Sequence, residues 1–193
     1  ALAEVDAAFE HHGSVHSKRP GGTPASTLGG GRAEGKKNWP VGERVSGSGQ
    51  NRPPSITVYA MDAQGDSPPL RTITGPQTQL NWPTGVAFDS GRGELYVAND
   101  QGEAILVFSG AASGNVAPVR ALKGPKTLIK NPTAVALDTQ NNELWVTNYG
   151  NHSATVYSMT AAGDTAPLRL IRASPRGVPA LMIGNPGALA YDS

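Results

Sequence analysis

Residues 82–89, Trp-Pro-Thr-Gly-Val-Ala-Phe-Asp, return 49 positions later as residues 131–138, Asn-Pro-Thr-Ala-Val-Ala-Leu-Asp. A third copy, Asn-Pro-Gly-Ala-Leu-Ala-Tyr-Asp, stands at residues 185–192, 54 positions after the second, so five residues are inserted before it. A second motif, Ile-Thr-Val-Tyr at residues 56–59, recurs as Ile-Leu-Val-Phe at 105–108 and as Ala-Thr-Val-Tyr at 154–157, again at a spacing of 49. Separate motifs that agree on one spacing establish an internal repeat, and its period decides the fold.

Each period contains four short runs rich in Val, Ile, Tyr and Phe, which is the composition of β-strands. Sequences such as Ser90-Gly91-Arg92-Gly93 separate the runs and favour tight turns. Four antiparallel strands in about 40–50 residues are typical of one blade of a β-propeller. In the central copy we predict strands over residues 85–89, 94–99, 104–109 and 119–123.

We therefore predict an all-β fold in which residues 55–193 form about three propeller blades, an incomplete ring because propellers have at least four. The first copy is partial, since residues 56–60 and 70–74 correspond only to third and fourth strands. Val41–Val45 is a weak candidate for one of the missing strands. Two explanations stay open: the chain is part of a longer propeller, or further copies or another chain complete the ring.

The composition excludes several classes of protein. With 24 glycines and 16 prolines among 193 residues, long helices and coiled coils are not expected. The absence of cysteine rules out disulfides and thiolate-ligated metal sites. A net charge of +1 gives no electrostatic basis for nucleic-acid binding. No apolar run approaches the roughly 18 residues of a membrane span, so no membrane span is expected.

Residues 1–54 differ in character from the repeats, and we predict an extended, low-complexity, glycine-rich arm. The arm has too few large apolar side chains to offset the entropy of ordering an independent domain. Leu2, Val5 and Phe9 follow helical spacing, which predicts a short helix over residues 3–11. Phe9 and Trp39 are the apolar side chains of the arm that we single out as anchors for a partner.

The repeat motifs carry a family resemblance. Pro-Thr-Gly-Val-Ala-Phe-Asp at 83–89, Gly-Glu-Leu-Tyr-Val-Ala-Asn at 93–99 and Ile-Leu-Val-Phe at 105–108 resemble NHL-type six-bladed propellers and the related lactonase-like seven-bladed ones. Residues 114–120, Gly-Asn-Val-Ala-Pro-Val-Arg, are similar to blades of secreted bacterial propellers of that group. The resemblance covers residues 55–193 only. It implies six or seven blades in the whole ring and an extracellular or periplasmic location, but these folds host binders, lyases and hydrolases alike.

Two sets of residues are weak candidates for metal binding. Asp89 and Asp138 end the first strand of successive blades, where carboxylates in register can hold a cation such as Ca²⁺. We expect them instead to accept hydrogen bonds from the turns that follow, because they obey the repeat and catalytic residues normally break it. His12 and His16 have the spacing of metal ligands on a helix, but Gly13 interrupts that helix. We predict no cofactor.

Residues that break the repeat are weak candidates for a binding role, and a lone exposed loop histidine is more often neither a ligand nor a base. Asp100 and Tyr149 occupy equivalent positions after the second strands, and His152 lies close to Tyr149. Together with Phe9 and Trp39 they are our candidate partner-binding residues. Arginines also recur on the fourth strands, where we expect each to pack its stem on its own blade and to pair locally; the alternative is a ring that binds acidic polymers. They are Arg71, Arg120 and Arg169.

The sequence contains no nucleophile elbow, zinc-protease motif or phosphate-binding loop. We therefore name no catalytic residue and expect a non-enzymatic structural or interaction module. Its propeller faces and N-terminal arm would hold a protein partner or another copy of the chain. The alternative is a lactonase-like hydrolase or lyase with a cation in the central channel.

Overall fold

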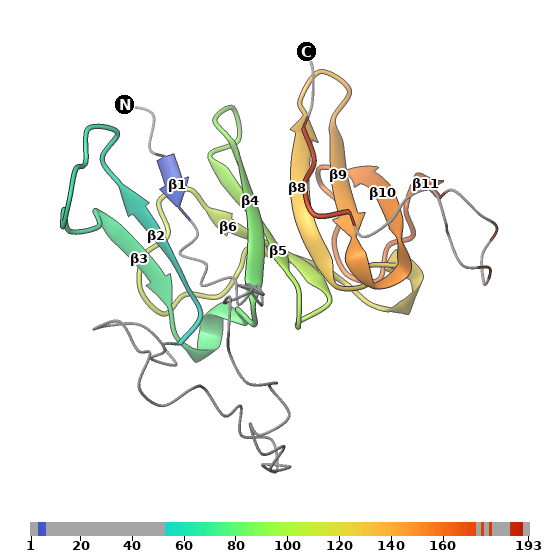
Figure 1. Cartoon of the computed structure of the whole chain (residues 1–193), viewed down its shortest axis with the longest axis horizontal. Coiled ribbons are helices and arrows are strands. Elements are labelled where there is room, and N and C mark those ends of the chain that lie inside the picture. The colour runs from blue at the N-terminus through green and yellow to red at the C-terminus, as the bar shows by residue number, and fades with distance from the viewer. Residues whose placement is uncertain (1–3, 7–52, 173–174, 176–177, 179–185, 191–193) are drawn as a thin grey trace, which may run out of the picture. The chain divides into compact units, whose positions relative to one another are not determined.

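The computed structural model describes residues 4–6, 53–172, 175, 178 and 186–190. By its contacts the chain divides into one unit of residues 1–9 with 53–193 and another of residues 10–52, and all described residues belong to the first. The regular elements are strands in three antiparallel sheets, each one propeller blade (Figure 1), and three-residue 3-10 turns. The all-β prediction of four-stranded blades is thus confirmed, and no described helix is long and apolar enough to cross a membrane.

The two complete blades have the same strand order along the chain and across the sheet. The first strand of the central copy begins at Pro83, two residues before the predicted start, and the first strands of both blades carry a register shift just after the initial proline. The other predicted strands agree within one residue. Blade B consists of β4 (Pro83–Asp89), β5 (Glu94–Asn99), β6 (Ala104–Ser109) and β7 (Arg120–Lys123). Blade C consists of β8 (Pro132–Asp138), β9 (Glu143–Asn148), β10 (Ser153–Ser158) and β11 (Arg169–Ile171).

The remaining sheet, blade A, has three strands in the described chain: β1 (Glu4–Asp6), β2 (Ser55–Tyr59) and β3 (Arg71–Thr74). β1 pairs antiparallel with β2 and so stands where β5 and β9 stand in the other blades. The helix predicted over residues 3–11 is therefore wrong at residues 4–6. Pairing with an open strand edge overrides a weak local helical pattern. Val41–Val45 lies outside the described residues.

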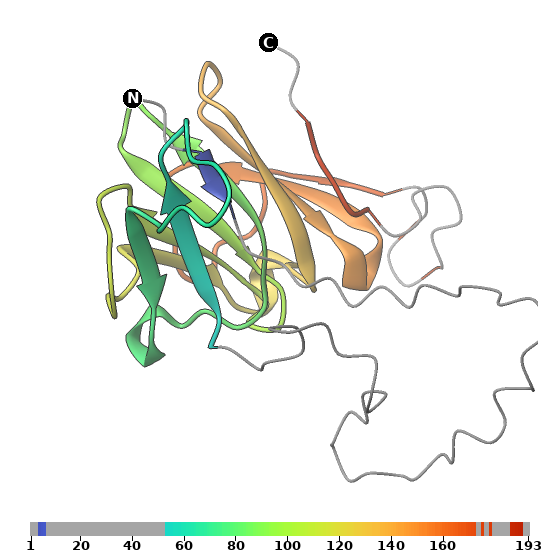
Figure 2. The ribbon, with the colours of Figure 1, turned by 60° about the vertical axis from the view of Figure 1, so that its left-hand side comes forward.

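Both faces of blade B are buried, which explains why its middle strands are continuously apolar. Side chains alternate along a strand, so Leu95 and Val97 join the cluster with blade A while Tyr96 and Ala98 join the cluster with blade C. The two clusters are separate cores, one at each blade junction, and Figure 2 shows the sheets of blades B and C side by side.

A repeated backbone contact joins each blade to the next. The Gly114 amide donates to Thr72 O at 2.7 Å, and the Thr74 amide donates to Gly114 O at 3.1 Å. Gly163 makes the same two bonds with Ala121 and Lys123, at 2.8 and 3.0 Å. Both glycines have a positive φ, 73° and 61°, which favours glycine over other residues. The fourth strands of blades A and B are therefore covered edges.

Candidate functional site

The loops whose sequences differ between the repeats lie at one end of the blades. β5 and β9 end there, β4 and β8 begin there, and the linkers between blades pass alongside through η2 (Pro76–Thr78) and η3 (Pro125–Thr127). We call this end the loop face. On it, a groove of about 890 Å³ opens between blades B and C. Polar and charged residues of the groove wall are Gln101, Glu103, Lys123, Lys130, His152 and Arg172.

Asn131 connects two of the predicted partner-binding residues on this face. Its side-chain amide donates to Asp100 Oδ1 at 2.7 Å, and its backbone carbonyl accepts from the Tyr149 amide at 3.0 Å. Asp100 belongs to blade B and Tyr149 to blade C, so the linker asparagine holds the two loops together across the junction. Tyr149 as a residue is 48% exposed, which leaves it accessible on the loop face.

His152 follows the short 3-10 turn η4 (Tyr149–Asn151) and lies in the groove wall. Its backbone is left-handed, with φ of 53°, and Glu103 has the same conformation, φ 46°, at the equivalent position of blade B. Glu103 forms an ion pair with Lys130, which also lines the groove. The structure thus brings Asp100, Tyr149 and His152 to one face, whereas Phe9 and Trp39 lie outside the described residues.

Asp89 and Asp138 are buried and form the turn hydrogen bonds that we predicted. Asp89 Oδ1 accepts from the amides of Gly91 and Arg92 at 2.8 and 3.1 Å, and Oδ2 accepts from the Arg92 guanidinium at 2.9 Å. Asp138 accepts from the amide and side chain of Asn141 at 2.9 and 2.7 Å. The hydrogen bonds from Arg92 and Gly91 outweigh burial and lower the pKa of Asp89.

Within the described part of the chain, no three His, Asp or Glu side chains gather as a metal site. His12 and His16 lie outside that part. The second-strand asparagines have a structural role, because Asn99 Oδ1 accepts from the Asn81 amide at 2.6 Å and Asn148 Oδ1 accepts from the Lys130 amide at 3.2 Å. The repeated polar residues therefore hold turns and linkers in place.

Comparison with known proteins agrees with this architecture. The sequence profile of a family described as "Lactonase, 7-bladed beta-propeller" matches residues 45–179, more than two thirds of the chain. The chain belongs to this family. No curated protein sequence matches it.

Two solved structures are similar to this lactonase-family chain at low sequence identity. A chain of the crystal structure of the nidogen/laminin complex is 18% identical, with 61% of this chain and 38% of that chain covered and a TM-score of 0.44. The WD40 β-propeller domain of Doa1 is 15% identical, with coverages of 58% and 36% and a TM-score of 0.42. The chain thus spans little more than a third of either structure's chain.

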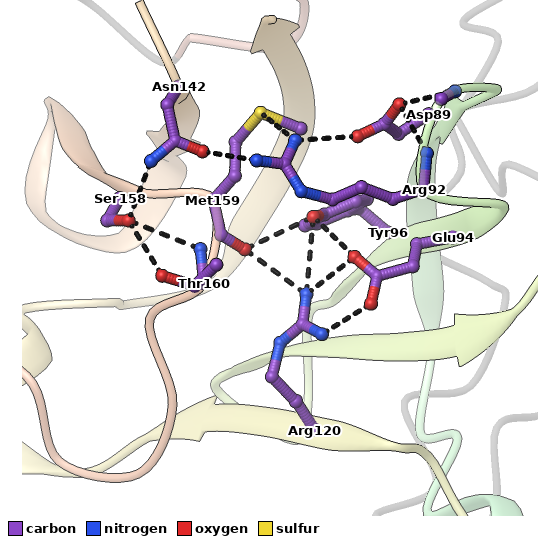
Figure 3. Close-up of polar contacts among 10 residues, drawn as sticks. Asp89, Arg92, Glu94, Tyr96, Arg120, Asn142, Ser158, Met159 and Thr160 are labelled. Atoms are coloured by element: carbon purple, nitrogen blue, oxygen red, sulfur yellow. Dashed lines mark hydrogen bonds and ion pairs between the residues drawn. The ribbon is translucent and has the colours of Figure 1, made fainter.

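The end opposite the loop face holds a polar cluster at the junction of blades B and C (Figure 3). Arg120 of β7 donates two hydrogen bonds to the carboxylate of Glu94, at 2.5 and 2.8 Å. The same guanidinium donates to the backbone carbonyl of Met159, in blade C, at 3.2 Å. The Tyr96 hydroxyl reaches Glu94 Oε2 at 2.9 Å and Met159 O at 3.1 Å. The cluster therefore joins the two blades of this lactonase-family chain.

The hydrogen bonds and the burial of this cluster shift the pKa values of Glu94 and Tyr96. The hydrogen bond from Arg120 lowers the pKa of Glu94 against the opposing effect of burial. Burial, with the neighbouring Glu94 carboxylate, raises the pKa of Tyr96 to about 12. Arg92 extends the cluster, because its guanidinium donates to Asn142 Oδ1 of blade C at 2.7 Å.

The local pairing predicted for the arginines is confirmed at Arg120 and Arg169, but the contact across the blade junction was missed. Arg71 makes the same kind of contact, from Nη1 to Gly110 O of blade B at 2.5 Å. The signal in the sequence was the common period: Arg71 and Arg120 are separated by 49 residues, as are Gly110 and Met159. Because the arginine donors and the residues with the accepting carbonyls recur at the same spacing, the same contact forms at both described blade junctions.

Proposed function

We propose that this lactonase-family chain is a non-enzymatic binding part of a propeller, and that its loop groove holds an acidic segment of a protein partner. The observation that carries the proposal is the charge of the groove wall. Lys123, Lys130 and Arg172 line the groove with one carboxylate, Glu103, which already pairs with Lys130. A groove with an excess of one charge attracts and orients a segment of the other charge.

The side chains around the groove support binding at this position. Asp100 and Tyr149 differ in chemistry at equivalent positions, as do Glu103 and His152, so the loop face is where the repeats diverge. Half-exposed Tyr149 adds an aromatic surface of the kind that anchors protein partners. The repeated carboxylates Asp89 and Asp138, in contrast, are engaged in turns.

Fluorescence anisotropy with a labelled glutamate-rich peptide tests this proposal. We expect the peptide to bind, the affinity to fall with added salt, and a lysine-rich peptide of equal length not to bind. The double variant Lys123→Glu/Arg172→Glu should abolish binding. Lys126→Glu is the matched control, because Lys126 is exposed on η3 but does not line the groove. Equal affinity in the double variant and the control would sink the groove as the site.

A second candidate is a lactonase-like hydrolase with a cation in the central channel, which family membership supports. Its residues would have to converge from several blades. Metal analysis of the purified chain, together with lactone hydrolysis followed with and without added Ca²⁺, distinguishes the two candidates. A stoichiometric metal with turnover would favour the hydrolase, whereas peptide binding by a metal-free, inactive chain would favour the binding module.

The NHL-type character and the extracellular or periplasmic location belong to this proposal as well. They are supported by the resemblance of residues 83–108 and 114–120 to such propellers. Fractionation of cells that express the complete gene product tests the location, and recovery in the cytoplasm would contradict it.

A further inference from the structure

Trp82 stands at a position of the repeat that favours asparagine. The other two copies have Asn131 and Asn185 there. The backbone of Trp82 is left-handed, with φ of 60°, and Asn131 has the same conformation, with φ of 45°. Asparagine adopts this conformation readily because its side chain is short and polar, whereas bulky residues rarely do. Tryptophan is therefore under backbone strain at residue 82.

The contact that the repeat makes at this position uses the backbone and not the indole. Trp82 O accepts from the Asp100 amide at 2.9 Å, and Asn131 O accepts from the Tyr149 amide in the same way, at 3.0 Å. Trp82 is also 41% exposed, so much of its apolar surface remains in contact with water. Strained residues gather at ligand-binding sites. Residue 82 is therefore a candidate binding position.

Trp82 begins a continuous row of residues that crosses the loop face from blade B to blade C. Its backbone bond places Asp100 opposite it, and the Asn131 side chain donates to Asp100 Oδ1 at 2.7 Å. Tyr149 follows through its own backbone bond to Asn131, and it is 48% exposed. We call these residues the aromatic row. It has an exposed aromatic residue at each end and a carboxylate and an amide between them.

The two middle residues of the row hold acceptor oxygens in fixed positions. Asp100 and Asn131 are half-buried, and the hydrogen bond between them orients both planar groups. A Cβ atom on Gly150 would lie 2.4 Å from Asn131 Oδ1, so glycine leaves room for this amide. Within the described part of the chain, no hydrogen bond reaches Asp100 Oδ2 or Asn131 Oδ1. Both oxygens can accept from a ligand without rearrangement, which lowers the entropy lost on binding.

A carbohydrate chain has the chemistry that this combination of side chains recognises. The C–H faces of a pyranose ring are apolar and stack on aromatic rings, while its hydroxyl groups donate to carboxylate and amide oxygens. Chains with β-1,4 linkages are straight and can follow an extended row, whereas α-1,4-linked chains coil. The carboxylate of Asp100 repels acidic sugars, so the row favours a neutral chain.

We propose that the aromatic row binds a neutral, β-1,4-linked polysaccharide. Sugar rings stack on Trp82 and Tyr149, and a hydroxyl group of the sugar between them donates to Asp100 Oδ2. The row is separate from the charged groove, because none of its four residues lines that groove. Polysaccharide binding at the row is therefore independent of peptide binding in the groove.

Isothermal titration calorimetry of the 193-residue chain with cellohexaose tests the proposal. Maltohexaose is the matched ligand, because it has the same composition with α-1,4 linkages. We expect cellohexaose to bind and maltohexaose to bind at least about tenfold more weakly. Added salt should leave the affinity for cellohexaose nearly unchanged, since the ligand carries no charge to be screened.

Trp82→Asn is the most direct variant, because it restores the residue that the other copies have at this position. It should weaken cellohexaose binding at least about tenfold, since an aromatic anchor is lost. Its melting temperature should equal or exceed that of wild type, because the backbone strain is relieved. Phe88→Ala is the matched control: Phe88 is 47% exposed at the other end of β4, and its loss should leave cellohexaose binding unchanged. Circular dichroism checks that each variant keeps its β-sheet content.

Further variants separate the aromatic row from the groove. Tyr149→Ala should weaken cellohexaose binding while Tyr149→Phe retains it, because stacking needs the ring and not the hydroxyl. The groove variant Lys123→Glu/Arg172→Glu should bind cellohexaose like wild type, whatever its effect on the acidic peptide. The proposal is overturned if cellohexaose does not bind, if maltohexaose binds equally well, or if Trp82→Asn binds cellohexaose like wild type. A lysine-rich peptide that binds in place of cellohexaose, and is lost in Trp82→Asn, would instead assign the row to a cationic partner.

Discussion

At the scale of single residues, the junction of blades B and C depends on groups that satisfy one another. The Tyr96 hydroxyl lies between Glu94, Arg120 and the Met159 carbonyl, all within 3.2 Å, and Tyr96 is fully buried. In such a site a polar atom without its partner costs more free energy than a hydrogen bond gains. The cluster therefore favours one alignment of the two blades over its alternatives.

Removing the Tyr96 hydroxyl should destabilise the chain. We expect Tyr96→Phe to lower the free energy of unfolding by about 1–2 kcal/mol, because the Met159 carbonyl and the Glu94–Arg120 pair lose a buried partner. Urea denaturation followed by circular dichroism measures the change. Tyr149→Phe is the control, since Tyr149 is 48% exposed, and it should unfold like wild type. Equal midpoints for all three proteins would contradict the role given to Tyr96.

The buried tyrosines should also make stability depend on alkaline pH. Burial raises the pKa of both Tyr96 and Tyr157 to about 12, from an ordinary value of 10.0. The folded state holds the protonated phenols, so their contribution is complete below pH 10.0 and is lost as the pH rises toward about 12. A titration of phenolate absorbance should show a late step that Tyr96→Phe reduces. If the folded chain titrates in one step at the ordinary value, this prediction is wrong.

At the scale of secondary-structure elements, the first strands of neighbouring blades come very close. A Cβ atom on Gly85 of β4 would lie 2.9 Å from Thr133 O and 3.0 Å from Ala134 Cα of β8. Both are backbone atoms, so a side chain at this position can fit only if the strands separate. Glycine at residue 85 therefore sets the spacing of β4 and β8, while the Thr84 hydroxyl donates to Pro132 O of β8 and the Thr133 hydroxyl donates to Pro186 O.

Substitutions at Gly85 should separate blades B and C in proportion to their size. We expect Gly85→Ala to lower the free energy of unfolding by about 1 kcal/mol and Gly85→Val by up to about 3 kcal/mol, as overpacking does in well-packed cores. Thermal and urea unfolding of the two variants beside wild type measure the series. A valine variant as stable as wild type would show that the strands are not held at this distance.

The sequence predicts the blades well because their information is local and repeated. Apolar residues at strand spacing, turns such as residues 90–93, and a constant period place β4 to β10 within two residues. β1 was missed because its partner, β2, lies some fifty residues away and the local pattern favours a helix. For the candidate site, the period places Asp100, Tyr149 and His152 on one face. It does not reveal the groove, which depends on how two blades lie together.

At the scale of the whole molecule, two separate apolar cores hold the three blades together, one at each junction. Ile73 and Leu122 occupy equivalent positions on the fourth strands of blades A and B and are 2% and 1% exposed. Burial of apolar area is the main favourable contribution to folding. Because the same repeat position is buried at both junctions, both cores should contribute to the stability of the described blades.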